Sequence, residues 1–179
     1  MPKTTIQFTK IRDVKSPNRA NKHDAGTDFF IPNFDEQFLK DLAAKNKNVF
    51  ISHFIDEEGN KAAKITIPPF RDVLIPSGIK VNIFDKNSYL AANNKSGVAT
   101  KYKLDVGANV VDADYQGEVH IHLVNQSDSE VVLQTGQKVI QFIHKEYIQT
   151  YWQEITNEDY NKIEASDRGT GGFASTGEK

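Results

Sequence analysis

Short runs in which hydrophobic and polar residues alternate cover most of the chain, and glycine-containing turns separate them. The alternation is most regular in residues 117–125 (GEVHIHLVN), where Val119, Ile121 and Leu123 share one side of an extended strand. Residues 5–11 (TIQFTKI) follow the same period. Many short strands with little helix predict an all-β fold of jelly-roll type.

Two longer segments each contain two apolar runs on either side of a glycine. They are residues 72–84 (DVLIPSGIKVNIF) and residues 131–143 (VVLQTGQKVIQFI). Two strand-like runs joined by a glycine-containing turn predict a β-hairpin. We therefore expect one hairpin in each segment.

The segment from residue 33 to about residue 65 departs from the strand pattern. Residues 35–46 (DEQFLKDLAAKN) place Phe38 and Leu42 at helical spacing among good helix formers, which predicts a short amphipathic helix. Strand-like residues then flank a turn at residues 58–60, which predicts a hairpin. We interpret this segment as an insertion that contains a short helix.

Composition narrows the possible partners and compartments. A chain of 179 residues is long enough for one well-buried domain, and we expect a single domain over residues 1–179. The net charge of −2 offers no basic surface for nucleic acid, so no nucleic-acid partner is expected. There is no cysteine, and no apolar run has the length of a signal peptide or a membrane span. We expect a cytoplasmic protein with no membrane partner.

Five polar, glycine-containing stretches interrupt the strand pattern. They are residues 25–30 (AGTDFF), 94–101 (NKSGVATK), 107–118 (GANVVDADYQGE), 136–143 (GQKVIQFI) and 168–177 (RGTGGFASTG). Together they supply lysine and arginine cations, hydroxyl groups, exposed glycine amides and carboxylates. Cations, hydroxyls and amides suit phosphate, and carboxylates suit a divalent cation or an activated water. The set indicates a nucleoside polyphosphate with Mg²⁺.

Each stretch taken alone has a simpler interpretation. The stretches at 94–101 and 107–118 also fit plain turns, and Gly169 to Ala174 match a dinucleotide-binding pattern without room for the helix that this pattern requires. His120 and His122 share one strand face, which we interpret as solvated rather than as a metal site.

In this order, the five stretches resemble the five motifs of the trimeric dUTPase family. The resemblance spans residues 25 to 177. It implies a jelly-roll-like β-clip fold and a homotrimer in which each active site draws motifs from three subunits. It also implies an enzyme, a Mg²⁺-dependent dUTP pyrophosphatase. Such a hydrolase acts in nucleotide metabolism, where it cleaves dUTP to dUMP and pyrophosphate, keeps uracil out of DNA and supplies dUMP for thymidylate synthesis.

The resemblance assigns roles to residues of the first four stretches. It implies that Asp112 is the general base for a water that attacks the α-phosphorus, with Asp28 and Gln141 as further catalytic residues. The other residues bind substrate: Lys95, Ser96 and Gly97 the phosphates, Gly107, Asn109, Val110 and Val111 the uracil through the main chain, and Tyr115 the deoxyribose. No side chain is expected to bind the metal directly. The triphosphate and waters would hold Mg²⁺, with Asp28 in contact with those waters.

By the same resemblance, residues from about 166 to 179 form a flexible C-terminal lid that closes over the substrate. Arg168 would pair with the γ-phosphate and Phe173 would stack on uracil. Gly172 would let the chain wrap around the phosphates, and Ser175 and Thr176 would donate hydrogen bonds to them.

Three features depart from the family pattern. Lys95 stands where arginine is usual, and a point-like ammonium cannot make the two-pronged contact of a guanidinium. Asn109 replaces a common glycine and tolerates the same left-handed backbone. The insertion of residues 33–65 is either a tolerated surface addition or a site for a protein partner. Two other functions stay open at this point, a dCTP deaminase-like enzyme and a non-catalytic nucleotide-sensing regulatory protein.

Overall fold

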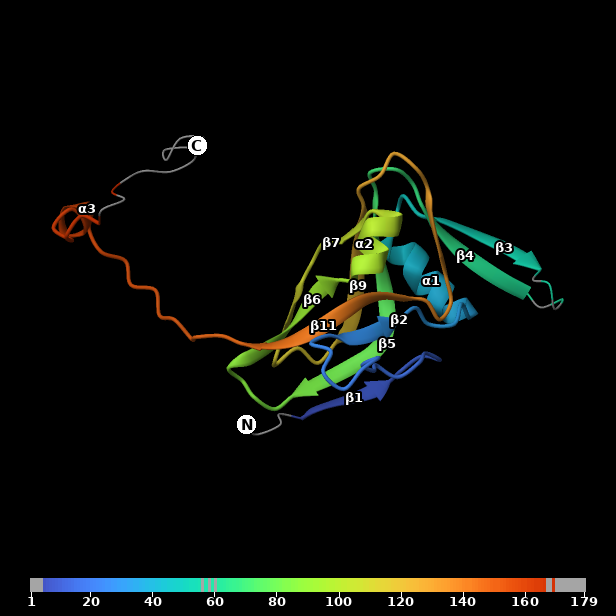
Figure 1. Ribbon diagram of the computed structural model, residues 1–179, viewed down its shortest axis with the longest axis horizontal. Coiled ribbons are helices and arrows are strands. Elements are labelled where there is room, and N and C mark those ends of the chain that lie inside the picture. Colours follow the sequence, from blue (N-terminus) through green and yellow to red (C-terminus); the bar gives the residue numbers. More distant parts are fainter. Residues whose placement is uncertain (1–4, 56, 58, 60, 167–168, 170–179) are drawn as a thin grey trace. The chain divides into compact units, whose positions relative to one another are not determined.

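The computed structural model describes residues 5–55, 57, 59, 61–166 and 169. The chain divides after Ile148 into two compact units, and Figure 1 shows the course of the chain through them. The expectation of one domain over residues 1–179 stays a prediction.

The first unit contains the described strands and two of the three described helices. The strands are β1 (Ile6–Lys10), β2 (Thr27–Phe30), β3 (Phe50–Ile55), β4 (Lys61–Ile67), β5 (Asp72–Ile83), β6 (Ser88–Asn94), β7 (Leu104–Val106), β8 (Val110–Asp112), β9 (Glu118–Asn125), β10 (Val131–Gln134) and β11 (Lys138–Glu146). The helices are α1 (Glu36–Lys45), α2 (Ser96–Tyr102) and, in the second unit, α3 (Asn157–Tyr160). The predicted all-β character is confirmed.

The strands form three sheets that share one hydrophobic core. Their orders are β1-β5-β9-β7, β2-β11-β6-β8 and β10-β4-β3. The alternation read in β9 is confirmed, since Val119, Ile121 and Leu123 are buried in the core. Phe29 of β2 and Phe142 of β11 also lie there, with ring centroids 4.5 Å apart. The core therefore fixes the strands from which the functional stretches project.

The hairpin predicted for residues 72–84 is wrong, because the segment is one continuous strand, β5. Gly78 has a φ of +74° and lies where the register shifts between Pro76 and Lys80, as in a β-bulge. The first half of β5 pairs with β9 and the second half pairs with β1. The glycine bends the strand between two partners instead of reversing it.

The turn predicted within residues 131–143 is present, but the hairpin is not. Gly136 has a φ of +74° between β10 and β11. β10 then pairs with β4, while β11 pairs with β2 and β6. The turn therefore carries the chain from one sheet to another.

The helix and the hairpin predicted in the insertion are both confirmed. Asp35 caps α1 by accepting a hydrogen bond from the Phe38 N–H at 2.7 Å, and Phe38 and Leu42 are fully buried. β3 and β4 form an antiparallel pair that projects from the rest of the first unit (Figure 1). Residues 56, 58 and 60 of its tip lie outside the described residues. The insertion thus has a core-bound helix and a projecting hairpin.

The second unit exposes large aromatic side chains. Tyr151 and Trp152 are 90% and 95% exposed, and a short helix, α3, begins after its N-cap Thr156. None of the helices in the described part of the chain is long and apolar enough to cross a membrane.

Candidate active site

The middle of the sheet β2-β11-β6-β8 brings three of the functional stretches together. β11 lies between β2 and β6, so that Gln141 is opposite Asp28 on one side and opposite Asn93 on the other. Lys95 follows directly after β6 and precedes the first turn of α2. Strand pairing alone therefore collects these predicted residues on one part of the sheet.

Asp28 is a buried carboxylate held by two lysines. It is 3% exposed, and its Oδ1 accepts a hydrogen bond from Lys95 Nζ while its Oδ2 lies 3.2 Å from Lys138 Nζ. A buried charge requires such partners, because desolvation penalises it otherwise. Two ammonium groups against one carboxylate leave an excess of positive charge at this point.

Lys138 was not among the predicted site residues. Its only sequence signal is a cation two positions after Gly136, inside a stretch already marked as functional. The pairing of β11 with β2 places it within reach of Asp28, and this pairing could not be read from the alternation of either strand.

Gln141 packs closely against the turn that precedes β2. Its Nε2 donates a hydrogen bond to the Asn94 carbonyl at 2.8 Å. A Cβ atom added to Gly26 would overlap Gln141 Oε1, so a glycine is required there by space. Gly26, also absent from the predicted site residues, therefore fixes the position of the Gln141 amide.

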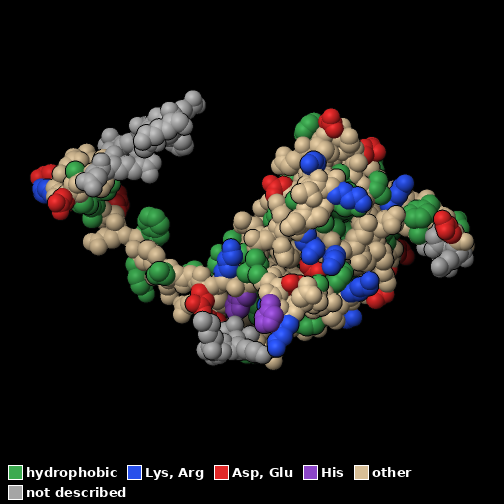
Figure 2. Space-filling view, viewed as in Figure 1, with side chains coloured by type: hydrophobic (Ala, Val, Ile, Leu, Met, Phe, Trp, Pro, Cys, Tyr) green, Lys and Arg blue, Asp and Glu red, His purple; other side chains and the backbone are tan. Residues whose placement is uncertain are grey.

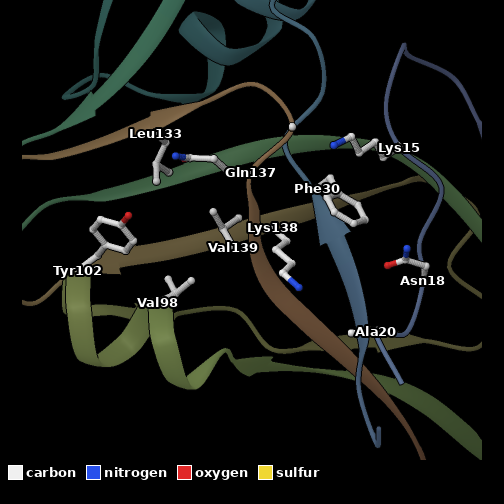
Figure 3. Close-up of a pocket in the computed structure, with 11 residues that line it drawn as sticks. Lys15, Asn18, Ala20, Phe30, Val98, Tyr102, Leu133, Gln137, Lys138 and Val139 are labelled. Carbon is white, nitrogen blue, oxygen red and sulfur yellow. The ribbon is translucent and has the colours of Figure 1, made fainter. Parts of the chain in front are cut away.

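A cavity of about 590 Å³ lies beside Asp28 and its two lysines, and Lys138 is part of its wall. Its lining includes Lys15, Phe30, Val98, Tyr102 and Lys138. Figure 3 shows these side chains coming from the loop after β1 and from β2, α2 and β11. In Figure 2, lysine and arginine side chains gather around a few acidic ones over α2 and β2. A cavity of this size with cationic walls can hold an anionic small molecule.

Ser96 and Gly97 form the first turn of α2. A Cβ atom added to Gly97 would meet nothing within 4 Å, so the surface above this residue is open. The Ser96 carbonyl accepts a hydrogen bond from the Thr100 hydroxyl at 2.8 Å. The serine hydroxyl and the Gly97 amide belong to the same turn, one residue beyond the lysine that holds Asp28.

β8 and the turn before it form a second group. β8 is the outermost described strand of its sheet and pairs with β6, with Asp112 opposite Tyr89. The Asn109 carbonyl accepts the Ala92 N–H at 2.8 Å, and Val110 is exposed. Because β8 is an edge strand, alternate main-chain groups along it point away from β6. Such groups can pair with the edge of a base.

Asp112 ends β8 at the surface. Its side chain is exposed and lines a polar cavity of about 310 Å³ together with Lys86, Ser88 and Tyr147. Lys86 Nζ donates to the Ala113 carbonyl at 2.8 Å. An exposed carboxylate next to a polar cavity can orient a water molecule.

The Tyr115 ring is fixed at both ends. Its hydroxyl donates to the Glu118 carbonyl at 3.0 Å, and its N–H donates to the Asp112 carbonyl at 3.1 Å. A Cβ atom on Gly117 would overlap the hydroxyl, so the glycine makes room for the ring. With 43% of the residue exposed, the ring forms a rigid wall beside Asp112.

Glu118 anchors the strand that follows Tyr115. Its carboxylate accepts hydrogen bonds from Arg12 Nε at 2.8 Å and from the Gly78 N–H at 2.7 Å. Burial by itself would raise the pKa of Glu118, but the hydrogen bonds from Arg12 and Gly78 lower that pKa below its ordinary value of 4.5. Arg12 also pairs with Asp41 of α1 at 2.6 Å, which joins the insertion to β9.

The solvated face expected for His120 and His122 is half-buried instead. The His120 ring lies 2.8 Å from the Glu118 carbonyl through Nδ1, and burial lowers its pKa. His122 contacts Ala108 and Asp72. In the described part of the chain, no group of three or more metal-binding side chains could hold an ion.

Asp28 and Asp112 are far apart within one chain, although the turn before β8 lies beside the end of β6, where the Val106 N–H donates to Asn94 Oδ1 at 2.8 Å. Asp28 and Asp112 lie at opposite edges of their sheet. Asp112 pairs with Tyr89 of β6, and Asp28 pairs with Gln141 of β11, which is opposite Asn93, four residues further along β6. Three strand spacings and this offset separate them by roughly 20 Å. Arg168, Gly172, Phe173, Ser175 and Thr176 lie outside the described residues.

Comparison with known proteins decides the family. A family model described as dUTPase matches residues 61–177, which is well over half of the chain. The chain belongs to the dUTPase family. The deoxyuridine 5'-triphosphate nucleotidohydrolase of Chlamydia muridarum is 35% identical over 126 residues, which cover 69% of this chain and 83% of the relative. That of rice is 34% identical over 118 residues, and the match spans about two thirds of each protein, 66%.

Solved dUTPase structures share the fold. The Staphylococcus bacteriophage 80alpha dUTPase with dUpNHpp superposes with a TM-score of 0.69 at 17% identity, over 97% of this chain and 98% of that one. The EIAV dUTPase gives a TM-score of 0.58 at 21% identity, over 89% and 100%. A mutant of the dUTPase from phage phi11 of S. aureus, described with a structural Mg(II) ion, gives 0.62 at 16% identity, over 84% and 96%.

These comparisons confirm the resemblance read from the five stretches. The family match begins at residue 61, so α1 and β3 lie before it. It extends over four of the five stretches, from the one at residues 94–101 to the end of the one at residues 168–177. The stretch that contains Asp28 lies outside the match and is connected to it through strand pairing.

Proposed function

We propose that this protein hydrolyses dUTP to dUMP and pyrophosphate, with a water molecule attacking the α-phosphorus. The observation that carries the proposal is the family match over residues 61–177, which contains Asp112 and Tyr115. The reaction removes dUTP, which keeps uracil out of DNA, and supplies dUMP for thymidylate synthesis. The curated relatives are named as dUTP nucleotidohydrolases, which favours this reaction over a dCTP deaminase or a non-catalytic nucleotide sensor.

Asp112 is the general base in this proposal. Its carboxylate is exposed at the end of β8 and can accept a proton from the attacking water. Tyr115 provides the wall against which deoxyribose packs, and a 2′-hydroxyl would collide with it. The rigidity of the ring supports this role, since both its hydroxyl and its main chain are hydrogen-bonded.

The phosphates bind at the Asp28 cluster. Lys95 and Lys138 supply positive charge there, and Ser96 and Gly97 add a hydroxyl and a main-chain amide in the first turn of α2. Gln141 would approach the α-phosphate. The fixed packing of Gln141 against Gly26 supports a positioning role for this amide.

Mg²⁺ would be held mainly by the triphosphate and by water. Both carboxylate oxygens of Asp28 already contact a lysine, which fits a contact through water better than direct coordination. Mg²⁺ keeps several of its waters in most sites, and bound to the triphosphate it would neutralise charge that develops on the leaving pyrophosphate.

Uracil would pair with main-chain groups of residues 107–111. Uracil offers an N3–H donor and an O4 acceptor, whereas cytosine offers the reverse. A fixed main-chain edge that suits uracil leaves cytosine with unpaired buried groups, which such sites reject by roughly 10⁴-fold or more. The edge position of β8 supports this assignment.

The active enzyme would be a homotrimer whose sites combine different copies. The separation of roughly 20 Å between Asp28 and Asp112 within one chain supports this, since both carboxylates would act around the same triphosphate. Exposed Tyr151 and Trp152 also support association, because large apolar surfaces mark interfaces. Residues from about 166 to 179 would then close as a lid, with Arg168 on the γ-phosphate and Phe173 on uracil. Gly172, Ser175 and Thr176 would surround the phosphates.

The decisive experiment measures pyrophosphate release from dUTP, dCTP, dTTP and UTP, with and without Mg²⁺. We expect release from dUTP alone, and only with the metal. In Asp112→Asn, turnover should fall by about 10²- to 10⁴-fold while dUTP still binds. Asp128→Asn, an exposed carboxylate between β9 and β10, serves as the matched control and should keep full turnover. Near-normal turnover of Asp112→Asn would remove the assignment of the base.

A further inference from the structure

The turn between β7 and β8 rests on the side chain of His122. The His122 Nδ1 accepts a hydrogen bond from the Ala108 N–H at 2.8 Å. On the same residue, the main-chain carbonyl accepts the Gly107 N–H at 3.1 Å. One residue of β9 therefore holds two consecutive amides of the turn.

Asp72 sets the state of this ring. The His122 Nε2 lies 2.9 Å from Asp72 Oδ2. Because Nδ1 accepts a main-chain N–H, the proton of the neutral imidazole must be on Nε2, where it is donated to the carboxylate. Asp72 of β5 thus selects the tautomer that leaves Nδ1 free to accept, and it orients the ring under the turn.

Gly107 leaves the space that the His122 ring occupies. A Cβ atom added to Gly107 would overlap His122 Nδ1. A side chain at this position would push the turn off the imidazole, so the glycine and the histidine form a matched pair. A surface histidine with no function in the turn would not require such a close approach.

The turn has few other fixed points. Ala108, Asn109 and Val110 are all exposed. On the β6 side, the Asn109 carbonyl accepts the Ala92 N–H at 2.8 Å, and the short β8 ladder follows. On the β9 side, the contacts of the turn in the described chain run through His122. Loss of the imidazole acceptor would leave the Ala108 amide without its partner and loosen the turn on that side.

We propose that His122, oriented by Asp72, is a positioning residue for nucleobase recognition: it holds the Ala108 amide and so fixes the main-chain edge that reads uracil. The inference rests on the proposed function, in which residues 107–111 pair with the base. It extends that function from the groups that contact uracil to the side chain that holds them in place. Asp112 is fixed separately, by pairing with β6, so the chemical step should depend little on His122.

Two substitutions of His122 separate its contact with the Ala108 N–H from its contact with Asp72. In His122→Asn, the side-chain oxygen takes the place of Nδ1 and can accept the Ala108 N–H, but the contact with Asp72 is lost. In His122→Gln, the longer amide can reach Asp72, but it has no acceptor at the Nδ1 position. The exposed His53→Gln on β3 is the matched control, because it lies in the insertion and away from the turn.

The measurements are KM and kcat for dUTP, and the ratio of kcat/KM between dUTP and dCTP. We expect His122→Gln to raise KM by about 5- to 50-fold, the range for one unpaired amide, with kcat within about threefold of the unsubstituted enzyme. The preference for dUTP over dCTP should fall by a similar factor. His122→Asn should recover most of both losses, and His53→Gln should change neither.

Amide hydrogen exchange at Ala108 provides a readout that does not depend on turnover. It should be faster in His122→Gln than in His122→Asn or in the unsubstituted protein. Asp72→Asn gives a second route if His122→Gln folds poorly, since loss of the oriented ring should raise KM in the same direction and leave β9 intact.

The outcomes distinguish the two proposals. An unsubstituted protein that releases no pyrophosphate from dUTP contradicts the proposed function, while Ala108 exchange still tests the anchor. An active protein in which His122→Gln leaves KM and selectivity unchanged contradicts the role of His122 alone. An equal loss of kcat in His122→Gln and His122→Asn also contradicts it, because that result indicates a general structural effect.

Discussion

The two lysines on Asp28 bear on the departure from the family pattern that the sequence indicates at Lys95. Lys95 stands where arginine is usual, and its ammonium contacts the buried carboxylate. An ammonium has three donors, so one can hold Asp28 while others remain for a phosphate. Lys138 balances the second oxygen of the same carboxylate. In the proposed phosphate site, the two ammonium groups would share the contacts that a planar guanidinium could make through its fixed fork.

Glu118 gives a residue-scale prediction about pH. Its pKa is below the ordinary 4.5 in the folded protein, so its pairing contributes full stability above about pH 4.5. That contribution disappears as the pH falls through the lower folded-state pKa. We expect Glu118→Gln to reduce the free energy of unfolding at pH 7 by about 1–3 kcal/mol, and to flatten its acid dependence.

Chemical denaturation between pH 3 and pH 7 measures both effects. The control is Glu130→Gln, an exposed carboxylate before β10, which should follow the unsubstituted protein. Parallel stability curves for Glu118→Gln and the unsubstituted protein would contradict the role of the Arg12 pair.

At the scale of elements, the insertion has an inner and an outer part. α1 is attached through buried Phe38 and Leu42, and through the Asp41–Arg12 pair. Asn46 at its end adds two hydrogen bonds to the main chain of Leu74, at 2.7 and 2.9 Å. β3, by contrast, is an edge strand whose Phe50 is 62% exposed. Only the outer part is therefore exposed in the way expected of a surface addition.

A pair of substitutions tests this division. Phe38→Ala removes a buried ring and should reduce the free energy of unfolding by about 3–5 kcal/mol. Phe50→Ala removes an exposed ring of the same insertion and should change it by less than about 0.5 kcal/mol. Thermal or urea unfolding of the two variants compares them directly, and equal losses would show that β3 is as integral as α1.

Element type was readable from the sequence where the pattern was local. The helix around Phe38 and Leu42 and the alternation in β9 were both predicted correctly, because each depends on neighbouring residues. The course of the chain at Gly78 was predicted wrongly, because a glycine between two apolar runs fits a hairpin and a bulge equally well. The partner strands decide between these, and they come from distant parts of the chain. Lys138 and His122 were missed for the same reason, as each acts on a residue brought near only by sheet pairing.

At the scale of the whole molecule, the proposed function predicts that Asp28 and Asp112 of different copies act in one site. Head-to-tail contacts around a threefold axis would place Asp112 at the end of β8 in one copy against Asp28 and its two lysines in the next. Because Asp28 and Asp112 lie roughly 20 Å apart within one chain, variants of these two residues can test the arrangement without a structure of the assembly.

Mixing two inactive variants provides the test. Asp112→Asn and Asp28→Asn should each be nearly inactive alone. When the two are denatured together and refolded, about a quarter of the sites should combine an intact Asp112 with an intact Asp28, if copies mix at random in a ring. We therefore expect recovery of about a quarter of normal turnover, measured as pyrophosphate release. Activity no greater than that of the separate variants would mean that each site is built within one chain.

The place of β3 on the outside of its sheet has an evolutionary consequence. β3 pairs with β4 and is therefore the edge strand of this sheet. It lies before residue 61, where the match to the family begins. Homologous proteins can therefore change the length or the side chains of this edge strand without changing the hydrophobic core. Diversity among near homologues should therefore accumulate in β3, and α1 should change slowly beside it.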